Sequence, residues 1–237
     1  MSYIDFERLA ALDVAGFQSQ TPYPWINPAD LLTPSGYAEL HKNLPAPEMF
    51  ENRIGLERKH RQPSHDRLAL EWNEDLELPG PWAEFVNELQ GKEYGGWLRE
   101  MFQVRSLRLN FHSHYTYRGA SVSPHCDSKH KLGSHIFYFN TDDDWQAEWG
   151  GETLVLDDGG RFDRRSAPDF DDFDAISESH SVGNRSFLFR SNGQSWHGVR
   201  EICCPEGHYR KVFIALVYSN APIDRVRALL HKNRRGY

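Results

Sequence analysis

The chain has 237 residues, an aromatic content of 13% and a formal net charge of −7 at pH 7. This acidic balance argues against broad, phosphate-driven binding of nucleic acid, and no stretch approaches the ~18 consecutive apolar residues that span a bilayer. The start of the chain lacks the basic and apolar regions of a secretory signal. Three cysteines (Cys126, Cys203 and Cys204) have no spacing typical of a disulfide framework or a zinc ribbon. We therefore expect a cytoplasmic globular protein without a membrane or nucleic-acid partner, and the oligomeric state stays open.

The first hundred residues are typical of helices and connecting loops. Thr33 is suited to cap a helix, because a hydroxyl followed by proline and then apolar residues at helical spacing marks a helix start. Residues 80–102 repeat the apolar pattern, and we expect breaks at Gly91 and at the Gly95-Gly96 pair. The aromatic residues of this half are interpreted as core contacts between helix and sheet.

From residue 104 the apolar pattern changes to the alternation of β-strands. The segments are rich in Val, Ile, Phe, Tyr and Thr and are separated by Gly, Asn and Asp, which favours an antiparallel sandwich or barrel. They are 104–117, 121–127, 131–140, 151–156, 185–191 and 209–219.

Two further segments stand apart from this pattern. The acidic stretch 157–180 is interpreted as a solvated insertion, with a lid beside an active site as the alternative. The last residues of the chain, from Asp224, indicate a short basic helix.

The short motif His125-x-Asp127 is a candidate metal site. On a strand, side chains two positions apart point to the same face, so both can approach one ion. A third ligand is available in His197, at the end of the strand 185–191. Two histidines and a carboxylate form the facial triad of non-heme Fe(II) oxygenases, but a zinc hydrolase can use the same ligands. In a chain with 12 histidines the motif also arises by chance.

The strand half of the chain resembles the prolyl-4-hydroxylase-like branch of the 2-oxoglutarate/Fe(II)-dependent dioxygenases. The similar motifs occur in the family's order over residues 105–220. They are HCDSKHKLGSHIFYFN (from His125), WGGETLVL (from Trp149), GNRSFLFRSNGQSWHGV (from Gly183) and GHYRKVFIALVY (from Gly207).

The resemblance implies a mainly β fold with flanking helices, built on a double-stranded β-helix (jelly-roll) core. We expect one oxygenase domain over 1–237: a mainly helical lead-in over 1–103, the jelly roll over 104–220 and a C-terminal helix over 221–237. By resemblance, the metal ligands are His125, Asp127 and His197, and the metal is Fe(II).

The resemblance also implies 2-oxoglutarate as co-substrate, with its far carboxylate bound by Arg210. A guanidinium suits this role because its planar fork can donate two parallel hydrogen bonds to a carboxylate. Lys211 is the rival cation, and alternation places it on the opposite face. Tyr138 matches a tyrosine that binds the same carboxylate, and Tyr115 matches one near the co-substrate, with Tyr117 as its competitor.

The expected activity is oxidative. 2-Oxoglutarate and O2 are converted to succinate and CO2 while an unidentified substrate is hydroxylated. The candidate substrates are a protein side chain, an amino acid and a small metabolite. Ascorbate is an optional additional cofactor. The departures from the family are Val212, where a hydroxyl residue is common, and the long 157–180 connection. The alternative functions are a metal-dependent hydrolase or isomerase on a cupin-like barrel and a non-catalytic ligand-binding module.

Overall fold

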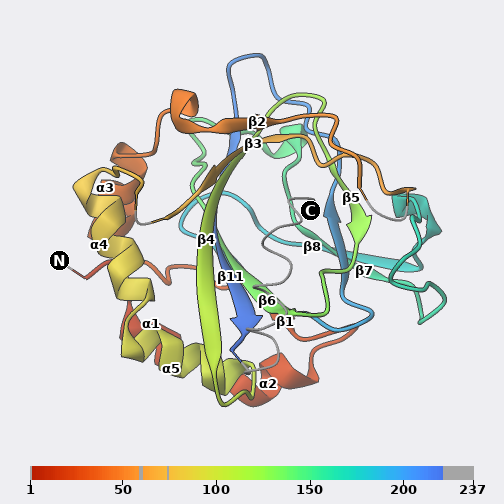
Figure 1. The fold of residues 1–237 in the computed structure, drawn as a ribbon, viewed down its shortest axis with the longest axis horizontal. Helices are drawn as coiled ribbons and strands as arrows, with labels where there is room; N and C mark the ends of the chain where they lie inside the picture. The colour runs from red at the N-terminus through yellow and green to blue at the C-terminus, as the bar shows by residue number, and fades with distance from the viewer. Residues whose placement is uncertain (1, 59–60, 74, 221–237) are drawn as a thin grey trace.

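The computed structural model describes residues 2–58, 61–73 and 75–220, and over this part of the chain two antiparallel sheets face each other (Figure 1). The larger sheet has the order β1-β9-β6-β11-β4-β3-β2 and the smaller one β5-β10-β7-β8. The strands are β1 (Trp25–Ile26), β2 (Glu51–Arg53), β3 (Arg67–Glu71), β4 (Leu107–Thr116), β5 (Val122–His125), β6 (Lys131–Tyr138), β7 (Leu154–Asp157), β8 (Ala175–Glu178), β9 (Ser186–Arg190), β10 (Trp196–Val199) and β11 (Arg210–Ser219). The prediction of a mainly β jelly roll with flanking helices is confirmed.

The helices cover the outer face of the larger sheet (Figure 1). Their apolar side chains form the main hydrophobic core with the outward-facing residues of β4, β6 and β11, including Phe111, Phe137 and Phe213. Thr33 caps a helix as expected, because its hydroxyl accepts a hydrogen bond from the Gly36 amide at 3.1 Å. In the described residues, none of the helices combines the length and the apolar character that crossing a bilayer requires. The helices are α1 (Phe6–Ala10), α2 (Val14–Ser19), α3 (Pro34–Lys42), α4 (Gly80–Leu89) and α5 (Lys92–Met101), with 3-10 turns η1 (Pro47–Met49), η3 (Ala147–Trp149) and η4 (Phe170–Asp172).

The expected helix break at the Gly95-Gly96 pair is wrong. Gly91 does separate α4 from α5, but α5 begins at Lys92 and continues through both glycines. Glycine costs only about 1 kcal/mol in a helix interior. The apolar stripe of α5, which includes Trp97 and Leu98, is buried against the sheet and offsets this cost.

His197 does not lie at the end of the strand that was expected to carry it. That strand is β9 of the larger sheet, whereas His197 belongs to β10 of the smaller sheet. The chain turns between them: the Asn192 amide donates to the Ser195 hydroxyl at 3.0 Å. Three short strands of the larger sheet, β1 to β3, also come from the first hundred residues, which were expected to be mainly helical. The C-terminal helix expected over 221–237 lies outside the described residues.

The acidic segment 157–180 is anchored by aromatic side chains and is not an open solvated loop. Phe162 and Phe173 pack edge-on against Trp196 at ring-centroid distances of 6.3 and 5.7 Å. The segment also supplies β8, which pairs with β7 and so extends the smaller sheet. Its acidic residues thus lie on a segment that is folded onto the smaller sheet.

One buried histidine of the main core predicts acid sensitivity of the fold. The Nδ1 atom of His135 is hydrogen-bonded to the Tyr94 hydroxyl at 2.8 Å, and burial lowers the pKa of His135 from 6.5 to about 3. Between these values the unfolded chain binds a proton that the folded chain does not. Stability therefore falls as the pH drops below about 6.5, by up to about 1.4 kcal/mol per pH unit for this group.

The substitution His135→Gln is expected to weaken this pH dependence by about one proton, while its amide group can still form a hydrogen bond with the Tyr94 hydroxyl. Urea unfolding at pH 7.5 and pH 5 measures the change. His180→Gln, at an exposed position, serves as the control and should leave the dependence unchanged. An identical pH dependence in the His135 variant would show that this residue is not buried in its neutral form.

Candidate functional site

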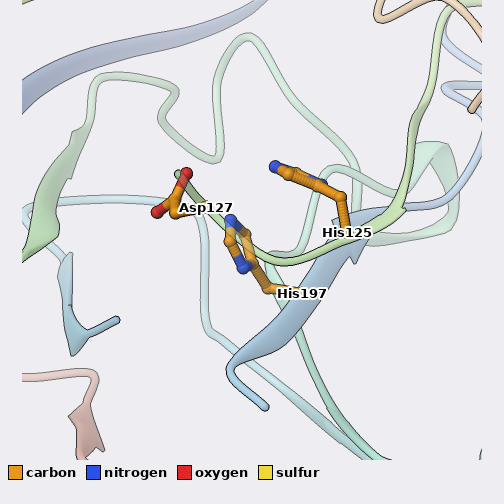
Figure 2. Close-up of side chains that lie close together, drawn as sticks. All are labelled: His125, Asp127 and His197. Carbon is orange, nitrogen blue, oxygen red and sulfur yellow. The ribbon is translucent and has the colours of Figure 1, made fainter. Parts of the chain in front are cut away.

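Two histidines and one aspartate converge between the two sheets (Figure 2). His125 ends β5, Asp127 follows two residues later, and His197 lies on β10 directly opposite His125 in the strand register. Each residue offers a ligand atom, and these atoms lie within 4.8 Å of one another. Figure 2 shows the three side chains turned toward a common point. This convergence agrees with the arrangement expected from the sequence.

The hydrogen bonds of both histidines prepare them to bind a metal. The Nδ1 atom of His125 lies 2.9 Å from the Ser123 carbonyl oxygen, and Nδ1 of His197 lies 2.9 Å from the Ser195 carbonyl oxygen. A carbonyl can only accept, so each Nδ1 carries the proton and each Nε2 keeps its lone pair. Burial lowers the pKa of both imidazoles and favours their neutral form.

Asp127 is held as a carboxylate by its neighbours. Lys131 donates to one carboxylate oxygen at 2.9 Å and Ser191 to the other at 3.0 Å. Burial opposes ionisation, but the charge of Lys131 and its hydrogen bond hold the pKa of Asp127 well below its usual range. Each carboxylate oxygen has two acceptor positions, so both can still bind an ion. Arg164, from the acidic segment, donates to the Asp127 carbonyl and fixes the backbone there.

Arg210 presents a buried cation to the space between the sheets. Its Nε donates to the Gly151 carbonyl at 2.5 Å, its Nη2 donates to the Thr153 hydroxyl at 3.3 Å, and the guanidinium lies over the Tyr138 ring at 5.5 Å. The Tyr138 hydroxyl contacts Thr153 at 2.8 Å and Ser179 at 2.9 Å. The sequence did not single out Thr153 and Ser179, and Thr153 contacts both Arg210 and Tyr138.

Two other residues from the sequence interpretation lie on the opposite face of the larger sheet. Lys211, the rival to Arg210, forms an ion pair with Asp144. Tyr115 is the register partner of Lys211, donates to the Pro45 carbonyl at 2.8 Å and stacks on Phe50. The expected proximity of Tyr115 to the co-substrate is therefore wrong, because the alternation along β4 turns this side chain toward the outside of the sheet.

One histidine that the sequence did not single out touches the triad. His65, from the connection between β2 and β3, lies edge-on to the His125 ring at a centroid distance of 4.7 Å. Its Nε2 lies 3.0 Å from the Ser123 hydroxyl. No spacing signal predicts this contact, because His65 precedes the triad by about 60 residues and reaches it through the sheet topology.

A glycine next to Arg210 predicts a sensitive position. Gly151 has φ +105°, and a Cβ there would lie 3.1 Å from Cδ of Arg210. We expect Gly151→Ala to lower the free energy of unfolding by about 1–3 kcal/mol through backbone strain, and in addition to displace Arg210. Gly119→Ala is the matched control, since Gly119 has φ +81° and no atom within 4 Å of its added Cβ. Urea unfolding compares the two, and equal losses would rule out a contribution from the Arg210 contact.

The comparisons with known proteins agree with this arrangement. Residues 110–218 match the family model of the 2OG-Fe(II) oxygenase superfamily. No curated protein sequence matches the chain. Among solved structures, a prolyl hydroxylase from Trichoplax adhaerens in complex with a hypoxia inducible factor oxygen degradation domain peptide is similar with TM-score 0.64 and 14% identity, covering 94% of this chain and 93% of that one.

Two further structures have the same fold at equally low identity. A Pseudomonas putida prolyl-4-hydroxylase is similar with TM-score 0.60 and 14% identity, covering 87% of this chain and 98% of that one. AviO1 from Streptomyces viridochromogenes Tue57 is similar with TM-score 0.56 and 14% identity, covering 89% and 97%. At this identity the likeness establishes the shared fold. The family match over residues 110–218 includes the triad but not β1, β2 and β3 of the larger sheet.

Proposed function

We propose that the chain is a 2-oxoglutarate-dependent dioxygenase of the 2OG-Fe(II) oxygenase superfamily, that its triad holds the iron and that it hydroxylates a substrate. His125, Asp127 and His197 bind Fe(II), and Arg210 binds the far carboxylate of 2-oxoglutarate. The products are succinate, CO2 and a hydroxylated substrate. We also propose that the chain forms one oxygenase domain, since the helices of its first half share a hydrophobic core with β4, β6 and β11.

One observation carries the proposal: the three ligand atoms lie within 4.8 Å of one another, and each histidine keeps a free Nε2 lone pair. Neutral imidazoles and a carboxylate are the ligand set of the facial triad. The arrangement leaves coordination positions for a chelating co-substrate. Fe(II) bound there supplies chelation of the keto acid and activation of dioxygen.

The protein's own residues provide positioning and charge. Arg210, desolvated by burial, offers its remaining N–H groups to a carboxylate, and the Tyr138 hydroxyl lies beside it. Lys131 and Ser191 fix the orientation of the Asp127 carboxylate. These contacts orient the two groups that would hold the metal and the far carboxylate, Asp127 and Arg210.

The direct test is spectroscopic. Protein loaded anaerobically with Fe(II) and then with 2-oxoglutarate is expected to develop the metal-to-ligand charge-transfer absorption of a chelated keto acid. On exposure to O2, succinate should form. A protein that binds Fe(II) but shows neither the band nor succinate would contradict the proposed function and would favour a metal-dependent hydrolase or a binding module.

The substrate has to be identified separately. The Trichoplax structure contains a peptide, so proline-containing peptides belong in a screen beside free amino acids and small metabolites. The readout is succinate release above the level without substrate, together with a mass gain of one oxygen atom in the substrate. Stimulated succinate release without that mass gain would point to an oxidative outcome other than hydroxylation.

A further inference from the structure

A second group of cationic side chains lies beside the triad, on the connection between β2 and β3 and at the start of β3. Arg58 donates through Nη1 to Nδ1 of His65 at 2.5 Å, and Arg67 donates through Nη1 to the His65 carbonyl at 2.7 Å. His65 in turn touches His125 and Ser123. Both guanidinium groups therefore contact His65, and His65 contacts the proposed metal ligand His125.

These two arginines are without a counterion among the described residues. No described carboxylate forms an ion pair with Arg58 or Arg67, and the Nε atom of each is buried without a hydrogen-bond partner. Arg53, the register partner of Arg67, shows the contrast, since it is paired with Glu51 and Glu71. Burying like charges together is costly unless an anion joins them.

The surrounding electrostatics agree with this shortage of negative charge. Burial lowers the pKa of Arg67 to about 10, and the charges of Arg53 and Arg58 act in the same direction. The charges of Glu71 and Asp66 oppose this shift but do not outweigh it. Asp127 is the carboxylate that favours the charged form of Arg58, but its oxygens already accept from Lys131 and Ser191. An anion supplied from outside would balance the positive charge of these two arginines.

The position of this group separates it from the proposed anchor for 2-oxoglutarate. Arg67 begins β3 and Arg210 begins β11, and β4 runs between these two strands in the sheet. His114 of β4 lies between the two cations, with its Nε2 buried and unpartnered, and its pKa is held well below the usual range by burial and by both arginines. One cationic group can therefore bind the co-substrate while the other binds a different anion.

Arg58 is held in place by a second segment of the chain. Gln62 accepts from Arg58 Nη2 at 3.2 Å and donates to the Ser166 carbonyl at 3.1 Å. The same acidic segment reaches the triad through Arg164, which donates to the Asp127 carbonyl. The β2–β3 connection extends toward this segment in Figure 1. Contacts on both sides thus orient the guanidinium before any substrate binds.

We propose that Arg58 and Arg67 bind an oxyanion of the primary substrate, a carboxylate or a phosphate, and so position the atom to be oxidised beside the metal. This inference rests on the proposed function and defines its substrate class as anionic. A guanidinium pair suits either oxyanion because each planar fork can donate parallel hydrogen bonds to two oxygens.

The test uses small anions on the protein saturated with Fe(II) and 2-oxoglutarate under anaerobic conditions, so that the proposed anchor is occupied. Sodium acetate and inorganic phosphate are titrated at constant ionic strength, with acetamide as the neutral analogue of acetate, and binding is followed by calorimetry. We expect saturable binding of at least one anion and none of acetamide. A preference for acetate identifies a carboxylate substrate and a preference for phosphate identifies a phosphorylated one.

The variants Arg58→Gln and Arg67→Gln are each expected to weaken anion binding at least tenfold, with Arg200→Gln, an exposed arginine, as the matched control. The charge-transfer band and the affinity for 2-oxoglutarate should persist in all three, which also verifies that they are folded. Lysine at either position should restore part of the affinity.

Absence of anion binding in the native protein overturns the inference, as does equal binding in all variants. Loss of 2-oxoglutarate affinity in the Arg58 and Arg67 variants overturns it too, because these residues would then serve the co-substrate. A missing charge-transfer band in the native protein contradicts the proposed function instead. In the substrate screen, stimulation confined to compounds without an oxyanion would likewise refute the anionic substrate class.

Discussion

Replacement of His125 and Asp127 together by alanine is expected to abolish Fe(II) binding at micromolar metal and all formation of succinate. Changes to residues that merely support a metal ligand typically cost 10- to 100-fold in affinity or activity. Removal of two of the three ligands leaves His197 alone, so the loss should exceed that range. Anaerobic Fe(II) titration and the charge-transfer band with 2-oxoglutarate measure the effect.

His180→Ala is the control for this experiment, because His180 is an exposed histidine outside the triad. It should retain the affinity for Fe(II) and the band. The decisive contrary result is a band that survives the double substitution with unchanged intensity. The iron would then be held elsewhere, and the assignment of these ligands would have to be abandoned.

Replacement of Arg210 by alanine is expected to weaken 2-oxoglutarate binding far more than Fe(II) binding. Truncation of one partner of a buried, hydrogen-bonded charge pair typically costs 2–5 kcal/mol, which corresponds to about 30-fold to several thousand-fold in affinity. The triad does not contain Arg210, so metal affinity should change little. Anaerobic Fe(II) titration gives the metal affinity, and titration of 2-oxoglutarate into the Fe(II)-loaded protein, followed by the charge-transfer band, gives the co-substrate affinity.

Lys211→Ala is the matched control, because this neighbouring cation points to the opposite face of the sheet and pairs with Asp144. Its loss should leave the affinity for 2-oxoglutarate unchanged. Equal loss of Fe(II) and 2-oxoglutarate binding in the Arg210 variant would indicate a general collapse of the site. A loss in the Lys211 variant alone would transfer the anchor role to that residue.

Several features of the molecule could be predicted from local patterns. Alternating apolar residues after position 104 indicated the strands because each strand has one face toward the core. The same alternation placed Arg210 on the inner face and Lys211 on the outer face. His125 and Asp127 could be paired because they are two residues apart, and no tertiary contact is needed to bring them close.

Other features depend on contacts between distant segments. α5 continues through Gly95 and Gly96 because burial of its apolar stripe outweighs a local preference of about 1 kcal/mol per glycine. The outward direction of Tyr115 follows from the register of β4 in the sheet, which no single segment encodes. The motif match alone had placed this tyrosine near the co-substrate.

The sequence by itself determined the strand-rich architecture, the metal-binding motif and the resemblance to the oxygenase family, because these depend on residue type and short spacing. Tertiary structure decided which distant side chains surround that motif. It brought His197 opposite His125 across a strand pair, and it placed His65 with Arg58 and Arg67 beside the triad. Such neighbours come from sheet pairing and loop packing over long sequence separations, and these contacts leave no periodic signal in the chain.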